Sequence, residues 1–144
     1  MFKRKGRILF LDPGDGTRAR MAEGWARELG ARWLETGCAV LGEGCPEPAL
    51  VRVMAEAGAA ARDEPCPLWD PGTADRWDLV VLLAVDREEV PAGLGGARLK
   101  RWDMGAVGAG SKSPDLRACR EVLRDRVSGL VGGFRLKARE DPDQ

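Results

Sequence analysis

Residues 7–25 (RILFLDPGDGTRARMAEGW) join an apolar run to a helical pattern through a glycine-rich loop. The backbone N–H groups of such a loop, with the positive end of the helix that follows, can bind an oxyanion. Arg18 could close over that anion with a pair of parallel hydrogen bonds. The position where a reactive side chain is expected holds Asp12, followed directly by Pro13. The pattern predicts an anion-binding loop, and the alternative is a tight turn that only joins a strand to a helix.

This loop needs a strand and a helix to position it, and the hydrophobic pattern predicts both. Apolar runs predict strands at 7–11, 32–35, 77–85 and 97–102, and helical periodicity predicts helices at 17–30, 49–57, 86–90 and 114–131. Glycine and proline predict loops at 37–48, 65–72 and 105–113. Apolar strands that alternate with helices are typical of a parallel sheet covered on both faces. We expect a three-layer α/β sandwich in which a four-stranded parallel sheet carries helices on both faces. Residues 1–135 are expected to form one domain and residues 136–144 a charged, flexible tail.

Composition excludes several classes of protein. The chain has 144 residues and a formal net charge of zero, so no global field attracts nucleic acid or an anionic membrane. The longest apolar run, residues 79–85, is too short to span a bilayer. Residues 1–6 (MFKRKG) are basic but lack the apolar core of a secretory signal. We expect a cytoplasmic domain without a nucleic-acid or membrane partner.

The inventory of reactive side chains is short. The chain contains no histidine, which removes the commonest general base and the commonest transition-metal ligand. No two cysteines form a CxxC pair, so we expect neither a metal site nor a cofactor. In a cytosolic chain all four cysteines are expected to be free thiols, with a redox pair between Cys38 and Cys45 as the alternative. The four are Cys38, Cys45, Cys66 and Cys119.

The first loop and helix resemble the low-molecular-weight protein tyrosine phosphatase family, including its thioredoxin-coupled arsenate reductase branch. The family signature is Cys, five residues, Arg, then Ser or Thr, commonly continued by Met-Ala-Glu-Gly. Here the same frame reads DPGDGTRA, followed by MAEG at 21–24. Further likeness lies in ETGC at 35–38, VMAEAG at 53–58, WDLVV at 77–81 and RWD at 101–103. The resemblance spans roughly residues 7–131 and implies the family's three-layer fold.

The residues that carry chemistry depart from the family pattern. The nucleophilic Cys is replaced by Asp12, and the Ser or Thr after the arginine by Ala19. Residues 104–107 (MGAV) stand where the family has its Asp-Pro general acid, and residues 84–91 contain no resolving cysteine. Arg18 alone is retained. The resemblance therefore implies a degenerate anion loop, formed by Asp12, Pro13, Gly14, Asp15, Gly16, Thr17 and Arg18.

Electrostatics opposes anion binding in this loop. A phosphate about 5 Å from the Asp12 carboxylate would be repelled by roughly 3 kcal/mol at an effective dielectric near 20, more than a hundredfold in affinity. Pro13 also removes one backbone N–H from the loop. We predict that the Asp12 carboxylate itself occupies or neutralises the anion site, paired with Arg18. Asp15 is expected to cap the helix or brace the loop, and Glu23 to brace a neighbouring loop or take part in a cation site.

The leading interpretation is a non-catalytic binding or regulatory module with an unidentified protein partner, which binds a small oxyanion weakly if at all. One alternative is a phosphatase-like hydrolase that uses Asp12 with a divalent metal, for which Asp78 and Asp86 are loose candidates as further ligands. Another is a redox or arsenical-binding protein that uses Cys38 and Cys45.

Overall fold

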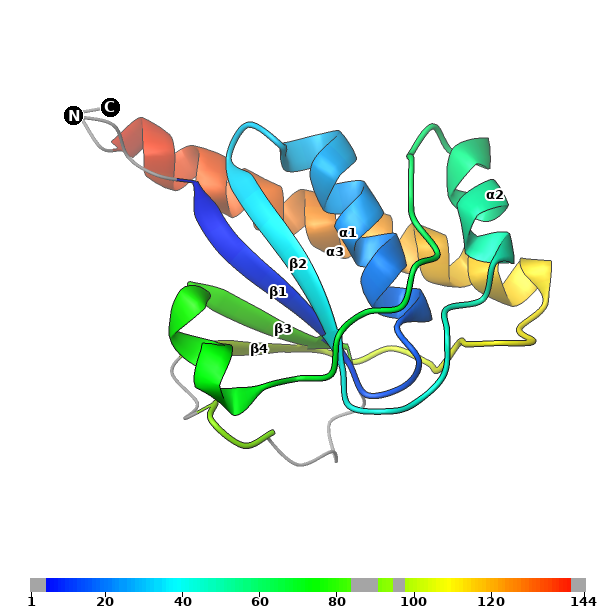
Figure 1. Ribbon diagram of the computed structural model, residues 1–144. Coiled ribbons are helices and arrows are strands. Elements are labelled where there is room, and N and C mark those ends of the chain that lie inside the picture. The colour runs from blue at the N-terminus through cyan, green and yellow to red at the C-terminus, as the bar shows by residue number, and fades with distance from the viewer. Residues whose placement is uncertain (1–4, 84–90, 95–97, 141–144) are drawn as a thin grey trace.

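A single parallel sheet organises the chain (Figure 1). The computed structural model describes residues 5–83, 91–94 and 98–140. The strands are β1 (Gly6–Asp12), β2 (Leu34–Val40), β3 (Leu79–Leu83) and β4 (Leu99–Trp102), in the order β2-β1-β3-β4. All neighbouring strands are parallel, and the register sets Phe10 beside Cys38 on one side and Val81 on the other. The predicted four-stranded parallel α/β fold is confirmed.

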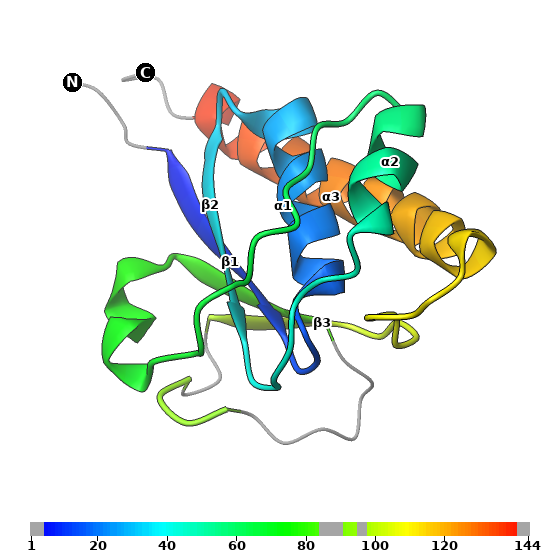
Figure 2. The same cartoon turned by 45° about the vertical axis from the view of Figure 1, so that its right-hand side comes forward.

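Helices were expected on both faces of this sheet, but the three α-helices found among the described residues lie on one face (Figures 1 and 2). They are α1 (Thr17–Gly30), α2 (Ala49–Glu56) and α3 (Ser113–Glu140). Alternate residues of the strands point to this face, where Ile8 and Phe10 of β1 are fully buried with Trp25 of α1 and Leu123 of α3. Burial of one such aliphatic or aromatic side chain contributes about 1.5–3 kcal/mol, so this layer carries most of the hydrophobic stabilisation.

The opposite face is covered differently. Its buried side chains, Leu9, Leu11, Ala39, Val80 and Leu82, pack against Trp69, Trp77, Leu94 and Leu99. Trp69 and Trp77 flank η1 (Pro71–Arg76), a 3-10 helix that the sequence did not predict and that buries no side chain of its own. The Asp70 side chain accepts a hydrogen bond from the Gly72 backbone and so initiates η1. The short helix expected at 86–90 lies outside the described residues.

Strand β2 runs further than the sequence indicates. It was expected at 32–35, with a loop from 37, but the ladder to β1 continues to Val40. Glycine is unfavourable within strands, yet Gly37 is required here because a Cβ would lie 2.6 Å from Cη2 of Trp77. The indole of Trp77 therefore explains why a glycine continues this strand.

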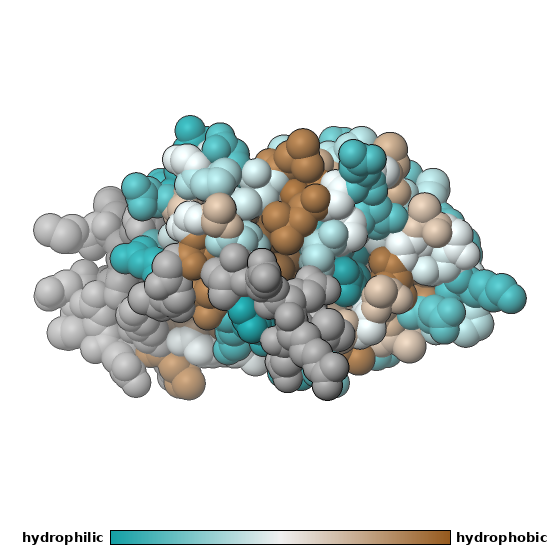
Figure 3. Space-filling model, turned by 90° about the horizontal axis from the view of Figure 1, so that it is seen from below, coloured by the Kyte–Doolittle hydropathy of each residue, from teal (hydrophilic) through white to brown (hydrophobic). Residues whose placement is uncertain are grey.

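Helix α3 is also longer than the expected 114–131 and extends to Glu140, within the segment predicted to be a flexible tail. Its C-terminal half is held by close contacts with glycines: Val131 packs on Gly30, and the ring of Phe134 packs on Gly6. No helix in the described part of the chain is long and apolar enough to cross a membrane. Exposed apolar side chains include Leu41 and Leu68, on segments joined by the Val40–Leu68 bridge. Figure 3 shows a face on which hydrophobic residues gather in a patch among polar ones.

An arginine cluster on Glu56 ties α2 to α3. The Glu56 carboxylate accepts hydrogen bonds from Nε and Nη2 of Arg117, both at 2.9 Å, and from Nη1 of Arg120 at 3.1 Å. Arg52 adds an ion pair at 3.5 Å from within α2. The Arg117 hydrogen bonds, helped by the charges of Arg117 and Arg52, lower the pKa of Glu56 from 4.5 to about 2.

Replacing Glu56 with Gln should flatten the acid limb of the stability curve. A carboxyl whose pKa is lowered on folding stabilises the native state fully above its unfolded pKa, and this contribution is lost as the pH falls from about 4.5 towards 2. Urea unfolding at neutral pH should show Glu56→Gln less stable than the parent, and the difference should vanish near pH 2. The control Glu28→Gln, on α1, should follow the parent curve. Equal acid sensitivity of parent and Glu56→Gln would contradict this assignment.

Candidate functional site

The anion loop lies at the C-terminal edge of the sheet, where β1 ends and α1 begins. Ligand sites in open parallel sheets lie at this edge. Gly16 has a φ of 98° and forms the N-cap of α1, a conformation that favours glycine. A Cβ at Gly16 would lie 3.1 Å from Val40 and 3.2 Å from Sγ of Cys66. The loop is therefore closed from one side by the end of β2 and by the segment that carries Cys66.

The carboxylate of Asp12 lies inside this loop and is fully buried. Its Oδ1 accepts hydrogen bonds from the Gly14 backbone and from Nη2 of Arg18, both at 2.8 Å. Its Oδ2 accepts from the backbone N–H groups of Arg18 at 3.0 Å and of Ala19 at 3.2 Å. Four donors thus surround the two oxygens, and the predicted ion pair with Arg18 is present.

The guanidinium of Arg18 is almost as buried, with 6% of its side chain exposed. Besides the bond to Asp12, its Nη1 donates a long hydrogen bond of 3.5 Å to the Gly105 carbonyl. Its Nε is buried without a hydrogen-bond partner among the described residues. Asp12 therefore does not use all of the hydrogen-bonding capacity of Arg18. An unsatisfied buried donor of this kind costs about 1–3 kcal/mol.

The mouth of the loop is bridged by the glycine-rich segment 105–112. Asp15 braces the loop as expected, because its Oδ1 accepts from the backbone and hydroxyl of Thr17 at 3.0 and 2.7 Å. Its Oδ2 accepts from the Ala109 backbone at 2.7 Å. Glu47 accepts from the Gly110 backbone at 3.2 Å, and its own N–H donates to the Thr17 hydroxyl at 3.0 Å. Sequence reasoning missed Glu47, whose only signal was a carboxylate two residues before α2, where it also caps Ala49.

The other predicted catalytic positions bring no acid or metal ligand to the site. Met104 is buried, and the segment 104–107 meets Arg18 through the backbone carbonyl of Gly105. Asp78 accepts a hydrogen bond from the Arg7 backbone at the opposite end of β1 from Asp12, so it cannot join Asp12 around one ion. Asp86 and the resolving-cysteine region at 84–90 lie outside the described residues. Among the described residues no cluster of three or more metal-ligating side chains occurs.

The cysteines differ from both sequence expectations. Cys38 and Cys66 form a disulfide with Cα atoms 5.7 Å apart, whereas Cys45 is free and exposed and Cys119 is free and buried. Four free thiols and a Cys38–Cys45 pair were therefore both wrong. The reason is a long-range contact: the segment after Cys66 runs beside the end of β2, where the Val40 N–H donates to the Pro67 carbonyl at 2.9 Å.

Cys119 of α3 is no substitute nucleophile. Burial raises the pKa of its thiol to about 12, and the nearby Arg18 only partly opposes this while Asp12 adds to it. A thiol with such a pKa is protonated at neutral pH, and the thiolate is the reactive form.

Glu23 braces a neighbouring segment and does not face an open cation site. Its Oε1 pairs with Arg20 at 2.9 Å, Arg62 at 3.7 Å and Arg27 at 3.9 Å. Arg20 continues to the Glu64 carbonyl at 2.7 Å and the Pro65 carbonyl at 3.1 Å, which fixes the chain next to Cys66. Three guanidinium groups occupy the surroundings in which a cation would bind.

The chain is similar in sequence to arsenate reductases. It is 35% identical over 83 residues to the arsenate reductase of Bacillus licheniformis, which is 57% of this chain and 59% of that protein. It is 34% identical over 80 residues to the arsenate reductase of Bacillus subtilis, 55% of this chain and 57% of that protein. The chain thus spans a little over half the length of these relatives. No protein-family model matches it.

Solved arsenate reductases share the fold. A structure of an arsenate reductase in the phosphate-binding state superimposes with a TM-score of 0.76, covering 90% of this chain and 98% of that one at 21% identity. The arsenate reductase of Archaeoglobus fulgidus gives 0.72 over 87% of this chain and 98% of that one, at 22% identity. The structural likeness shows the low-molecular-weight phosphatase-like fold. Together with the sequence similarity it supports the predicted relationship to that family and its arsenate reductases.

Replacing Asp12 with Ala should destabilise the protein by about 3–5 kcal/mol, because it leaves the Arg18 guanidinium buried without a counter-charge. Inorganic phosphate should restore part of this loss, since an anion bound to the native state stabilises it by mass action. Chemical unfolding with and without phosphate, at equal ionic strength, measures both effects. Asp15→Ala, which leaves the Asp12–Arg18 pair in place, should gain no more stability from phosphate than the parent does. Loss of less than about 1 kcal/mol in Asp12→Ala would show that the pair is not the main support of the loop.

Proposed function

We propose that this protein is a catalytically silent relative of the arsenate reductases, a binding or regulatory module whose oxyanion site is filled by its own Asp12 carboxylate. One observation carries the proposal: three backbone N–H groups and the Arg18 guanidinium converge on the two oxygens of Asp12. These are the kinds of donor that bind an oxyanion at the start of a helix. Here a carboxylate that belongs to the chain permanently occupies the place of such an oxyanion.

An incoming oxyanion would have to displace this carboxylate. Asp12 would then lose the four hydrogen bonds that it now accepts, or the oxyanion would have to share these donors beside a like charge. That repulsion is about 3 kcal/mol at 5 Å and an effective dielectric near 20, which lowers affinity more than a hundredfold. The bonds of Asp15 and Glu47 to the backbone of 109–110 hold the covering segment across the same mouth. Binding of a small anion in the loop is therefore expected to be weak.

The remaining chemistry of the loop supports the same proposal. The thiol of Cys119 interacts electrostatically with Asp12 and Arg18, and its pKa of about 12 keeps it protonated. A metal-dependent hydrolase built on Asp12 has little support, since both oxygens of that carboxylate already accept two hydrogen bonds each. The function left to the scaffold is recognition of a partner, for which we propose another protein.

Asp12→Cys tests whether the loop is intact and Asp12 is what disables it. The parent should not hydrolyse p-nitrophenyl phosphate, with or without Mg²⁺, and should not consume arsenate in the presence of thioredoxin. Asp12→Cys should gain measurable hydrolysis, because a thiol at the start of the loop would be activated by Arg18 and the helix end. Asp12→Ser, of matched size but a poor nucleophile, should remain inactive. Parent turnover that requires Mg²⁺ and is abolished in Asp12→Asn would overturn the proposal.

A second candidate function is thiol–disulfide chemistry, and the Cys38–Cys66 bond is the observation that favours it. Disulfides in cytosolic proteins are usually transient, catalytic or redox-sensing. This one joins β2 to the segment that closes the anion loop, with Sγ of Cys66 beside Gly16. Reduction would remove this covalent link, leave the backbone hydrogen bonds of Val40 in place, and yield two thiols that could serve a redox partner or bind a thiophilic arsenical.

Thiol counting tests this candidate. The denatured protein should react with two equivalents of a thiol reagent before reduction, from Cys45 and Cys119, and with four afterwards. The disulfide closes a span of 28 residues, so Cys66→Ser should lose about 3–4 kcal/mol under oxidising conditions and little under reducing conditions. Cys45→Ser is the matched control and should leave the stability unchanged under both oxidising and reducing conditions. Four reactive thiols without reductant would remove this candidate.

A further inference from the structure

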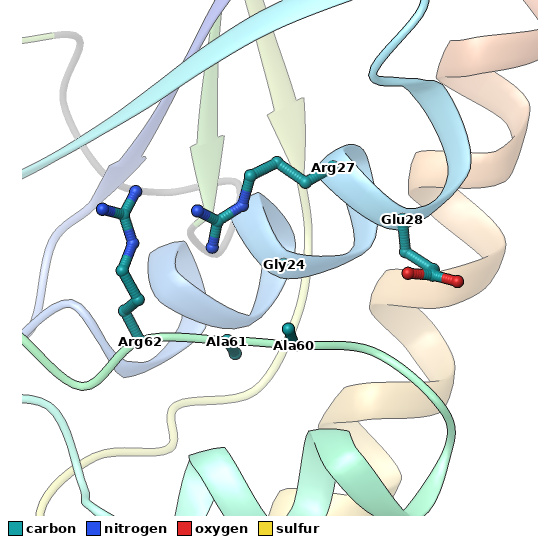
Figure 4. Close-up of a pocket in the computed structure, with 6 residues that line it drawn as sticks. All are labelled: Gly24, Arg27, Glu28, Ala60, Ala61 and Arg62. Atoms are coloured by element: carbon teal, nitrogen blue, oxygen red, sulfur yellow. The ribbon is translucent and has the colours of Figure 1, made fainter.

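A second cationic site lies on α1, away from the Asp12 loop. A pocket of about 300 Å³ opens between α1 and the extended segment that crosses it, lined by Gly24, Arg27, Glu28, Ala60, Ala61 and Arg62. In Figure 4 the side chains of Arg27 and Arg62 extend towards the same side from opposite walls, and Glu28 lies at the other end. None of these residues belongs to the anion loop.

Gly24 is the reason that the two walls approach each other. A Cβ at this position would lie 3.0 Å from the Ala60 carbonyl oxygen and 3.1 Å from Cβ of Ala61. A larger side chain would push the crossing segment off α1 or fill the space between the two arginines. The floor of the pocket is therefore small and apolar, and its charge lies at the rim.

The positive charge at this rim is not balanced. Three arginines face the single buried carboxylate of Glu23, but only Arg20 lies within hydrogen-bond distance, at 2.9 Å. Arg27 and Arg62 stand at 3.9 and 3.7 Å from the same oxygen. Glu23 offsets one of the three charges, and Glu28, at the other end of the pocket, offsets a second from further away, so a net positive charge remains beside the two guanidinium groups (Figure 4).

The donors of these two arginines are also open. Arg20 uses its nitrogens on Glu23 and on the Glu64 and Pro65 carbonyls. Within the described part of the chain, by contrast, Arg27 and Arg62 make only their long ion pairs to Glu23. Their side chains are 40% and 49% exposed, so a ligand can reach them from solvent.

From this geometry we propose that the Arg27–Arg62 pocket binds a phosphate-type dianion, either free phosphate or the phosphate group of a small monoester. Guanidinium groups bind tetrahedral oxyanions through paired hydrogen bonds, and the two guanidinium groups at the rim can each supply such a pair to one dianion. The volume is at the lower end of the range for small-molecule sites and admits a phosphate with a short organic group. A bound dianion would join α1 to the crossing segment and replace the repulsion between the two arginines with attraction. The pocket does not depend on whether the Asp12 loop is silent.

Backbone amide NMR of the full chain, titrated with inorganic phosphate at constant ionic strength, tests the proposal. The amides of Gly24, Ala60 and Ala61 should shift with a saturating curve. Arg27→Gln and Arg62→Gln should each weaken binding roughly tenfold or more, the loss expected for a hydrogen bond to a charged group. Arg62→Lys, which keeps the charge but not the paired donors, should fall between the parent and Arg62→Gln. Arg52→Gln, an arginine of similar exposure on α2, should bind as the parent does.

The outcomes separate this site from the loop. Shifts confined to Gly14, Gly16 and Thr17 would overturn the pocket and also contradict the silent loop. Non-saturating shifts, or equal weakening by Arg52→Gln, would overturn the pocket alone and leave the loop proposal standing. If the pocket binds, a second titration with phenyl phosphate identifies the source: tighter binding than inorganic phosphate indicates a monoester, and equal or weaker binding indicates free phosphate.

Discussion

The pairing of Asp12 with Arg18 constrains the whole edge of the sheet at which it lies. Two opposite charges buried away from water are tolerable only when their remaining lone pairs and protons are also satisfied. The backbone from Gly14 to Ala19 supplies three of the required donors, which fixes the turn after β1 and the first turn of α1 together. Gly16 takes up the left-handed conformation that this path requires. The loop geometry is thus set by a charge that the chain itself contributes.

A second set of contacts secures an extended segment that belongs to no helix or strand. Residues 59–66 cross α1, where apolar contact alone would leave them loosely held, since only Ala59 and Cys66 are buried there. Arg20 binds two of its carbonyls, and the disulfide joins its end to β2. Gly24 allows the close approach. Polar and covalent ties replace the hydrogen-bond ladder that a strand would have.

The sequence was sufficient where the information is local. The apolar run of β1, the helical periodicity of α1 and the pairing of Asp12 with Arg18 are separated by only a few residues, and all were predicted. The length of β2 was not, because it depends on the Trp77 ring resting on Gly37 from 40 residues away in the chain. Propensity treats a glycine as a break in a strand, but tertiary packing reverses that preference here.

The same limit applies to the site. The roles of Glu47 and of the Cys38–Cys66 bond depend on segments that meet only in the folded chain, and one-dimensional spacing favoured Cys45 as the partner of Cys38. Arg27 and Arg62 likewise look like ordinary solvent-facing charges in the sequence. They become a site because the crossing segment brings them to one buried glutamate.

The disulfide has a topological consequence for α2. Cys38 and Cys66 close a covalent ring that contains the end of β2 and all of α2. The helix contacts the rest of the protein mainly through the Glu56 cluster and three buried apolar side chains. While the ring is closed, α2 can open only with both of its ends held. The oxidation state of two cysteines at the edge of the sheet therefore determines how far a distant helix can move from its place on α3.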